Sequence, residues 1–265
     1  MLSRAGMGLL ERIQAHQRAV AHRQYEAVRV PPFTLFFHDT DPLPYFNYAI
    51  PDGPDAASFD LAAPLDRLAA EFRARRRVPR FEFVEAGAPC LGEALEAHGF
   101  ALENRAQLMV CPRGKERATP AVYGLDVARL DAATALEEFM TFLDVQRRAF
   151  GLPSARSPSD VEALSLRGTL GNGIALLGRI AGEPVATAMI QPASDGLTEL
   201  VGVSTLEPFR RRGIGGLLSF TAVRAAFDRG VSLAFLSAAD ARAGRVYEAA
   251  GFSPAGYSLF YRRPL

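Results

Sequence analysis

The stretch that decides the fold is Glu199-Leu-Val-Gly-Val-Ser-Thr205, followed after a short gap by Arg210-Arg-Arg-Gly-Ile-Gly-Gly-Leu217. The first segment is apolar and rich in β-branched residues, which predicts a strand, while apolar residues recur every three or four positions from Leu217 to Phe227, which predicts a helix. A strand, a basic glycine-rich turn and a helix in this order favour an anion site. Glycines let the backbone approach a ligand, and the helix N-terminus offers unpaired N–H groups.

The turn differs from two common phosphate-binding motifs. It lacks the Lys-Ser/Thr ending of a nucleotide-hydrolysing loop, and its glycine spacing misses the three-glycine dinucleotide pattern. We therefore expect it to hold a pyrophosphate on its backbone amides, with the arginines as additional positive charge.

A second motif follows about one helix and one strand later. Leu233-Ala-Phe-Leu236 predicts a buried strand, and the next helical segment contains Val246-Tyr247 and ends on Gly251-Phe252. Taken with Arg210-x-x-Gly213-x-Gly215, this order of motifs resembles the GNAT superfamily of acyl-CoA-dependent N-acyltransferases. The resemblance covers residues 123–262 well and residues 33–111 weakly.

The resemblance implies specific roles around the glycine-rich turn. Val203-Ser204-Thr205 would pair with the pantetheine arm like an added strand, a strand-end N–H near Val203 would polarise the acyl carbonyl, and the N–H groups of residues 211–216 would hold the pyrophosphate. The residues implied for acetyl-CoA binding are Val203, Ser204, Thr205, Arg210, Arg211, Arg212, Gly213, Ile214, Gly215, Gly216 and Asp240. Asp240 stands where the family usually has Asn, and a carboxylate accepts a hydrogen bond but does not donate one.

Tyr247 occupies the family position of the general acid that protonates the CoA thiolate, since a phenol with a reference pKa of about 10 is protonated at neutral pH. The alternative for Tyr247 is a packing residue. For the general base, all four histidines lie in the N-terminal half, so no histidine of the C-terminal unit can serve. Glu183 and Asp195, which lie in turns, and His38 of the N-terminal half are weaker candidates. The main candidate is Glu199. It precedes Val203 by an even number of residues, which predicts that both lie on one face of the strand. Glu199 as a solvated strand-end carboxylate stays open as the alternative.

An internal repeat relates the two halves at an offset of 152 residues. The segment 81–100 lies without a gap on 233–252, so that Phe83 meets Phe235 and Gly99-Phe100 meets Gly251-Phe252. The first copy lacks the glycines and arginines of the turn and has Leu95 opposite Tyr247. We therefore expect two GNAT-like units in tandem, of which the first does not bind CoA and serves in packing, dimer formation or shaping of the acceptor pocket.

The expected fold class is mixed α/β, with a mostly antiparallel sheet flanked by helices in each unit. The expected domains are a degenerate unit at 1–111, a linker at 112–121 and a catalytic unit at 122–265. The helix pair that contains the loop 151–158 would overhang the acceptor site, as the resemblance implies.

Composition narrows the function class. The net charge of +1 gives no support for nucleic-acid binding, and no apolar run reaches the roughly 20 residues of a membrane span. Cys90 and Cys111 have no metal-ligand spacing, so we expect no metal. A poor signal peptide favours a cytoplasmic protein, and Lys115 as the sole lysine among the 30 Lys and Arg residues fits a GC-rich bacterial genome.

The sequence thus predicts an N-acetyltransferase that moves an acetyl group from acetyl-CoA to a small primary amine. We expect direct attack in a ternary complex, because neither cysteine falls in a motif. The alternatives are a non-catalytic CoA-binding or ligand-sensing protein and, for residues 1–111, a structural partner subunit.

Overall fold

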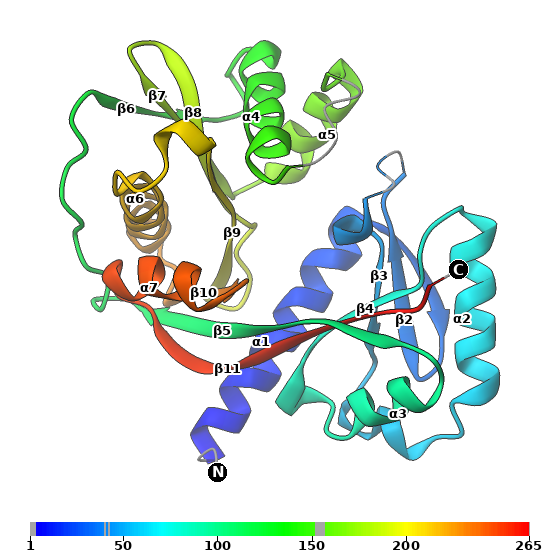
Figure 1. The fold of residues 1–265 in the computed structure, drawn as a ribbon. Coiled ribbons are helices and arrows are strands. Elements are labelled where there is room, and N and C mark those ends of the chain that lie inside the picture. The colour runs from blue at the N-terminus through cyan, green and yellow to red at the C-terminus, as the bar shows by residue number, and fades with distance from the viewer. Residues whose placement is uncertain (1–3, 40, 42, 152–156, 265) are drawn as a thin grey trace. The chain divides into compact units, whose positions relative to one another are not determined.

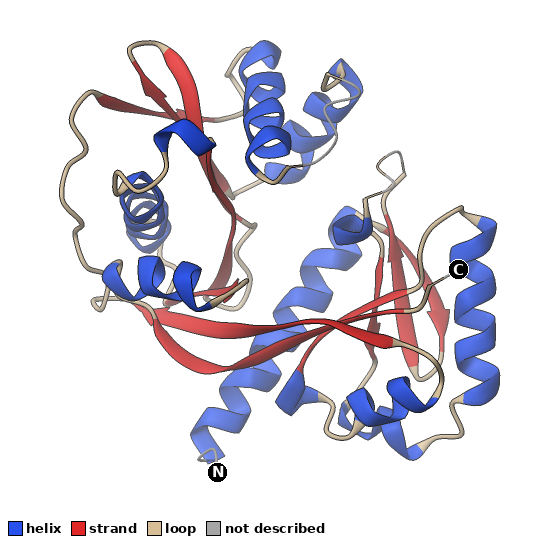
Figure 2. Ribbon diagram, in the orientation of Figure 1, coloured by secondary structure: helices blue, strands red, loops and turns tan. Residues whose placement is uncertain are grey.

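The computed structural model describes residues 4–39, 41, 43–151 and 157–264, and its helices and strands are shown in Figure 1 and Figure 2. The chain divides into two compact units. The first contains residues 1–108, 237–241 and 254–265, and the second contains residues 109–236 and 242–253.

The first unit is a mixed sheet with helices on both faces. Its elements are α1 (Arg4–Gln24), β1 (Glu26–Val30), β2 (Phe33–Phe37), β3 (Tyr48–Pro51), α2 (Ala62–Ala74), β4 (Arg80–Val84), α3 (Leu91–Ala97) and most of β11 (Ser253–Arg262). Strands β1, β2 and β3 are antiparallel neighbours, β3 pairs with β4 in parallel, and β4 pairs with β11 antiparallel.

Strand alternation divides the apolar residues of this sheet between two layers. Phe33 and Phe81 pack edge to face, with ring centroids 4.9 Å apart, in a core shared with α2 and α3. Phe36, on the other face, packs with Ile50 and with Ala21 of α1. The sheet is therefore buried on both sides, as a strand of five consecutive buried residues such as β2 requires.

The second unit has the same layered arrangement. Its elements are β6 (Leu125–Leu130), α4 (Leu136–Ala149), α5 (Asp160–Leu170), β7 (Ile174–Ile180), β8 (Glu183–Ile190), β9 (Leu197–Thr205), the short 3₁₀ turn η4 (Glu207–Phe209), α6 (Ile214–Asp228), β10 (Leu233–Ala238) and α7 (Ala241–Ala249). Strands β6 to β9 are antiparallel neighbours, and β9 pairs with β10 in parallel. Helices α4 and α5 share a core with one face of this sheet, while α6 contacts β7, β8 and β9.

The structure confirms the mixed α/β class and the repeat. Helix α2 begins at Ala62 and α6 begins at Ile214, which is the offset of 152 residues that the sequence predicts. In both units a parallel strand pair brackets this helix, β3 with β4 and β9 with β10. The order of helices and strands from β1 to β5 is therefore the same as that from β7 to β11, whereas the elements that precede β1 and β7 differ.

The compact units do not follow the chain as two consecutive blocks. Strand β5 (Ala101–Pro112) starts in the first unit and ends in the second, whose residues begin at Met109. Residues 254–265, expected in the C-terminal domain, group with the first unit because β11 pairs with β4, with Leu259 opposite Phe83. The segment 113–124 between β5 and β6 contains neither helix nor strand.

Candidate functional site

Strands β9 and β10 are paired over a short length only. Their parallel register runs from Leu197 opposite Leu233 to Glu199 opposite Phe235, whereas β9 continues to Thr205. Beyond Glu199, one edge of β9 is therefore available to another extended group. Residues 203–205, which the sequence predicts to pair with the cofactor, lie along this edge.

A β-bulge interrupts β9 inside this stretch. Its pairing with β8 shifts register between Met189 opposite Val201 and Thr187 opposite Ser204, so β9 carries one residue more than its partner. An extra residue reverses the alternation of side chains. The predicted shared face of Glu199 and Val203 is therefore wrong. Ser204 pairs with Thr187, and Thr187 lies on the same face of β8 as Met189, which packs against the α4 core. The side chain of Ser204 therefore lies on the α4 face, and that of Val203 lies on the opposite face.

Gly202 lies at the bulge and has a φ of +61°, a conformation that favours glycine. Its carbonyl oxygen accepts a hydrogen bond from Thr187 Oγ1 at 2.9 Å and from Gln146 Nε2 of α4 at 3.3 Å. A Cβ at this position would collide with Gln146 Nε2. Thr187 Oγ1 also lies 2.8 Å from Ser204 Oγ, and Thr187 is completely buried. The bulge is thus held by buried polar groups.

The glycine-rich turn opens α6 without a capping side chain. Arg211 has a φ of +65°, and Gly213, with a φ of +82°, is the N-cap residue of α6. Leu217 N donates to Gly213 O at 3.1 Å, and this is the first hydrogen bond of the helix. The N–H groups that precede Leu217 in the first turn of α6 have no helical carbonyl to donate to. They point outward from the N-terminus of the helix, which carries a partial positive charge. This is the local geometry of an anion site.

The three arginines of the turn differ in their surroundings. Arg210 donates to Thr205 O at 3.0 Å and to Ala149 O at 2.8 Å, so its side chain ties the end of β9 to the end of α4. Arg212 donates to Pro208 O at 3.1 Å. Arg211 is exposed. The arrangement leaves Arg211 as the arginine best suited to supply charge to a ligand, whereas Arg210 shapes the turn.

Helix α7 meets the start of α6 beside Val203. A Cβ placed on Gly215 would lie 3.7 Å from Val246 Cγ1 and 3.8 Å from Val203 Cγ1. Glycine at this position therefore lets β9, α6 and α7 approach closely. Tyr247, the next residue of α7, is half-buried, and its ring stands edge to face with Phe252 at 6.1 Å.

The predicted site residues are thus brought together in part. Val203 lies beside Gly215 of the glycine-rich turn, whereas the side chain of Glu199 lies on the opposite face of β9. Asp240 is exposed, immediately precedes α7 and groups with the first unit. Most of the predicted acceptor loop, residues 152–156, lies outside the described residues.

Sequence reasoning missed that the expected linker 112–121 and the adjoining Val122 contribute to this region. Thr119 Cγ2 would lie 3.5 Å from a Cβ on Gly216, and Val122 Cγ2 would lie 3.7 Å from one on Gly213. Arg117 N donates to Ala250 O at 3.0 Å, which anchors the segment to the end of α7. No motif or spacing marks these residues in the sequence.

Helices α4 and α5 are joined by a charged cap, in which Glu162 of the α5 N-terminal capping box forms an ion pair with Arg147 of α4. Ser159 and Glu162 form a capping box at the start of α5, and Arg147 of α4 donates to Glu162 Oε1 at 2.6 Å. Burial acts to raise the pKa of Glu162, but the hydrogen bonds from Ser159 and Arg147 outweigh it and lower the pKa to about 2. The α4–α5 corner is therefore fixed by an ionised carboxylate.

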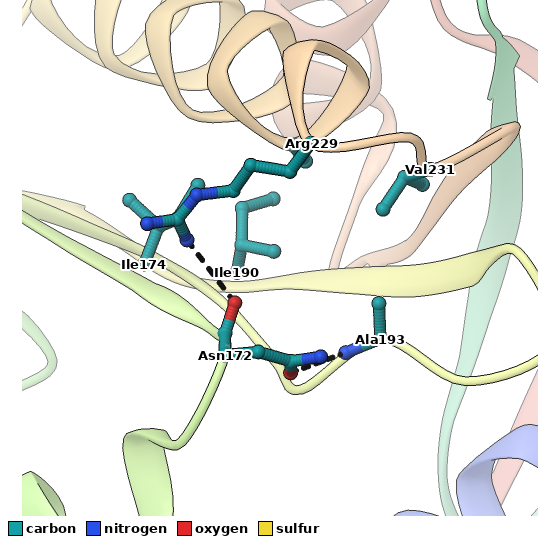
Figure 3. Close-up of a pocket in the computed structure, with 7 residues that line it drawn as sticks. Asn172, Ile174, Ile190, Ala193, Arg229 and Val231 are labelled. Carbon is teal, nitrogen blue, oxygen red and sulfur yellow. Dashed lines mark hydrogen bonds between the residues drawn. The ribbon is translucent and has the colours of Figure 1, made fainter.

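A cavity of about 290 Å³ lies at the opposite end of α6 from the glycine-rich turn (Figure 3). Arg229 reaches over it and donates to Asn172 O at 3.1 Å, and Asn172 Oδ1 accepts from Ala193 N. The cavity is separated from Gly213 by the length of α6. We therefore do not assign the acyl-transfer site to it.

The described residues contain no group of three or more His, Cys, Asp or Glu side chains arranged to hold a metal ion. None of their helices combines the length and the apolar character needed to cross a membrane.

The family model of the acetyltransferase (GNAT) family matches residues 140–252. Among curated proteins the sequence has no significant match. A GCN5-related N-acetyltransferase from Kribbella flavida is similar in structure, with 26% identity, coverage of 97% of this chain and 96% of that chain, and a TM-score of 0.78.

Two more distant structures share the fold. A GCN5-related N-acetyltransferase from Sphaerobacter thermophilus has 19% identity, coverage of 97% and 92%, and a TM-score of 0.66. A tandem GNAT protein from the clavulanic acid biosynthesis pathway has 14% identity, coverage of 87% and 77%, and a TM-score of 0.62.

Proposed function

Because residues 140–252 form an acetyltransferase domain of the GNAT family, we propose that the protein transfers an acetyl group from acetyl-CoA to the nitrogen of a small primary amine. One observation carries the proposal. The open edge of β9 leads directly into a turn whose backbone N–H groups face outward at the start of α6. An extended thioester arm and a pyrophosphate require these two features side by side.

The fit of acetyl-CoA to these residues follows from their chemistry. Residues 203–205 offer main-chain donors and acceptors to the pantetheine amides, and the N–H groups of residues 211–216 offer donors to the pyrophosphate. Arg211 adds positive charge. Gly215 keeps the space between Val203 and Val246 free of a side chain.

The proposed reaction is attack of a neutral amine on the thioester carbonyl. The C–N bond forms, the C–S bond breaks, and CoA leaves as a thiolate that takes a proton from Tyr247. The Val203 N–H stabilises the negative charge that develops on the carbonyl oxygen. The surplus proton of the amine passes to Glu199, directly or through water. Glu199 faces the α4 side of β9, so the amine would approach from that side the thioester held at the open edge of β9.

Direct attack is favoured over an acyl-enzyme by the state of Cys111. Burial raises the pKa of this thiol to about 12, with a further contribution from Glu116. The thiol therefore stays protonated at neutral pH, and a protonated thiol is a poor nucleophile.

The test is calorimetric titration of the purified full chain with acetyl-CoA. We compare the wild type with the double variant Gly213→Asp, Gly215→Asp, which places two carboxylates at the proposed pyrophosphate site. The matched control is Gly182→Asp, Gly230→Asp, which adds the same charge at two positive-φ glycines with open space around them.

Binding by the wild type and the control, and its loss in the Gly213, Gly215 variant, would support the proposed site. A screen of primary amines that measures release of free thiol would then identify the acceptor. A folded wild type that does not bind acetyl-CoA would refute the proposal, and binding without turnover on any amine would favour a CoA-binding or ligand-sensing protein.

A further inference from the structure

The peptide group between Gly202 and Val203 is restrained by side chains from two other elements. We propose that Gln146 of α4 and Thr187 of β8 are positioning residues of the acyl-transfer site, which orient the Val203 N–H through the Gly202 carbonyl. This inference rests on the proposed function and assigns to it two residues that do not contact the acetyl donor themselves.

The direction of the N–H follows from the geometry of the peptide. In a trans peptide the carbonyl of one residue and the N–H of the next point in opposite directions. The Gly202 carbonyl is held by Thr187 on the β8 side and by Gln146 on the α4 face. The Val203 N–H therefore points away from β8 and α4, toward the edge of β9 where pairing with β10 has ended.

The peptide is also prevented from rotating. Thr187 is completely buried and is itself held by Ser204 at 2.8 Å, so its hydroxyl has a fixed position. Gly202 adopts a φ of +61°, and Gln146 fills the space where a side chain on Gly202 would lie. Loss of either hydrogen bond would release a carbonyl in the one segment of β9 that the sheet does not hold.

The two hydrogen bonds have an electronic effect besides the geometric one. A carbonyl that accepts hydrogen bonds polarises its peptide group, which makes the N–H of the same group a stronger donor. The oxygen of the thioester gains negative charge only as the amine attacks. A better aligned and stronger Val203 donor therefore stabilises the transition state more than the bound substrate.

The experiment measures carbonyl polarisation directly and needs no acceptor amine. The wild type, Thr187→Val and Gln146→Met are saturated with acetyl-CoA labelled with ¹³C at the acetyl carbonyl, and the ¹³C resonance of the bound thioester is compared with that of free acetyl-CoA. We expect a downfield shift in the wild type and loss of most of that shift in both variants. The Kd for acetyl-CoA should change by less than about threefold, because the pyrophosphate and pantetheine contacts remain.

Two controls separate positioning from folding. Thr187→Ser keeps the hydroxyl and should retain the shift. Thr141→Val is the same Thr-to-Val change at a position on α4 whose hydroxyl donates to Glu137 O of its own helix, so it should leave the shift unchanged. With an amine that the wild type acetylates, Thr187→Val and Gln146→Met should lower kcat about tenfold each and leave the KM for acetyl-CoA unchanged. Circular dichroism checks that each variant is folded, and Gln146→Met, at a half-buried position, carries the test if Thr187→Val does not fold.

The outcomes distinguish this inference from the proposed function. A wild type that does not bind acetyl-CoA refutes the proposed function and the inference with it. Binding with an unshifted thioester resonance overturns the orientation of the Val203 N–H. A shift of full size in folded Gln146→Met and Thr187→Val overturns the role of the two positioning residues while the acyltransferase proposal stands.

Discussion

Replacing Gly251 by alanine should destabilise the protein strongly, because a Cβ there would enter the 113–124 segment between β5 and β6. Gly251 has a φ of +103°, and a Cβ would collide with Lys115 O and lie 2.8 Å from Glu116 Cα and 3.0 Å from Arg117 N. All three contacts are with backbone atoms, so the segment itself must move.

The magnitude can be worked out in parts. A left-handed conformation costs an L-residue about 1–2 kcal/mol. Displacement of the segment breaks the hydrogen bond from Arg117 N to Ala250 O, which is worth about 1 kcal/mol. Overpacking against a backbone that is tied down adds about 1–2 kcal/mol. Gly251→Ala should therefore lower the free energy of unfolding by about 3–5 kcal/mol.

Gly230→Ala is the matched control. Gly230 has a φ of +93° but no atom within 4 Å of its Cβ position. It bears the conformational cost alone, about 1–2 kcal/mol. Urea unfolding followed by circular dichroism measures both variants, and limited trypsin digestion reports release of the segment through its sites at Arg113, Lys115 and Arg117. Equal destabilisation by the two substitutions, with unchanged digestion, would refute the packing of the segment on α7.

Three further predictions concern titration and chemistry. The lowered pKa of Glu162 should add stability at neutral pH, about 1–2 kcal/mol after allowance for solvent screening. This stability is complete above pH 4.5 and is lost as the pH falls toward about 2. Glu162→Gln should therefore lower the free energy of unfolding at pH 7 and change it little near pH 2; an equal loss at both would contradict the charged cap. Tyr247→Phe should lower kcat about 10–100-fold with the KM for acetyl-CoA unchanged, and an unaltered kcat would assign Tyr247 to packing. Iodoacetamide at pH 8 should modify exposed Cys90 and leave buried Cys111 intact in the folded protein; mass spectrometry that finds Cys111 modified first would contradict its raised pKa.

The sequence predicted what depends on local pattern. The strand 199–205, the helix after the glycines and the offset between α2 and α6 all follow from hydrophobic periodicity and from motif spacing. Such features are fixed by neighbours within a few residues, so one sequence contains the information for them.

What could not be predicted depends on contacts between distant residues. The bulge at Gly202 is held by Gln146 and Thr187, and strand alternation alone placed Glu199 on the wrong face relative to Val203. The packing of Thr119 on Gly216 has no local signal either, since proline, alanine and charged residues around it are typical of a linker. Asp240 and the general acid role of Tyr247 stay predictions.

The position of β11 also affects how the protein folds while it is being synthesised. Within the first unit, β4 has β3 on one side and β11 on the other, and β11 is translated only after the whole of the second unit's sheet. Until then a nascent chain exposes an unpaired edge of β4, which is an aggregation hazard. The first unit thus cannot complete its sheet as it emerges from the ribosome, unlike a domain that folds in order of synthesis. Because residues from both ends of the sequence build this unit, a single cut in the chain cannot yield two complete units.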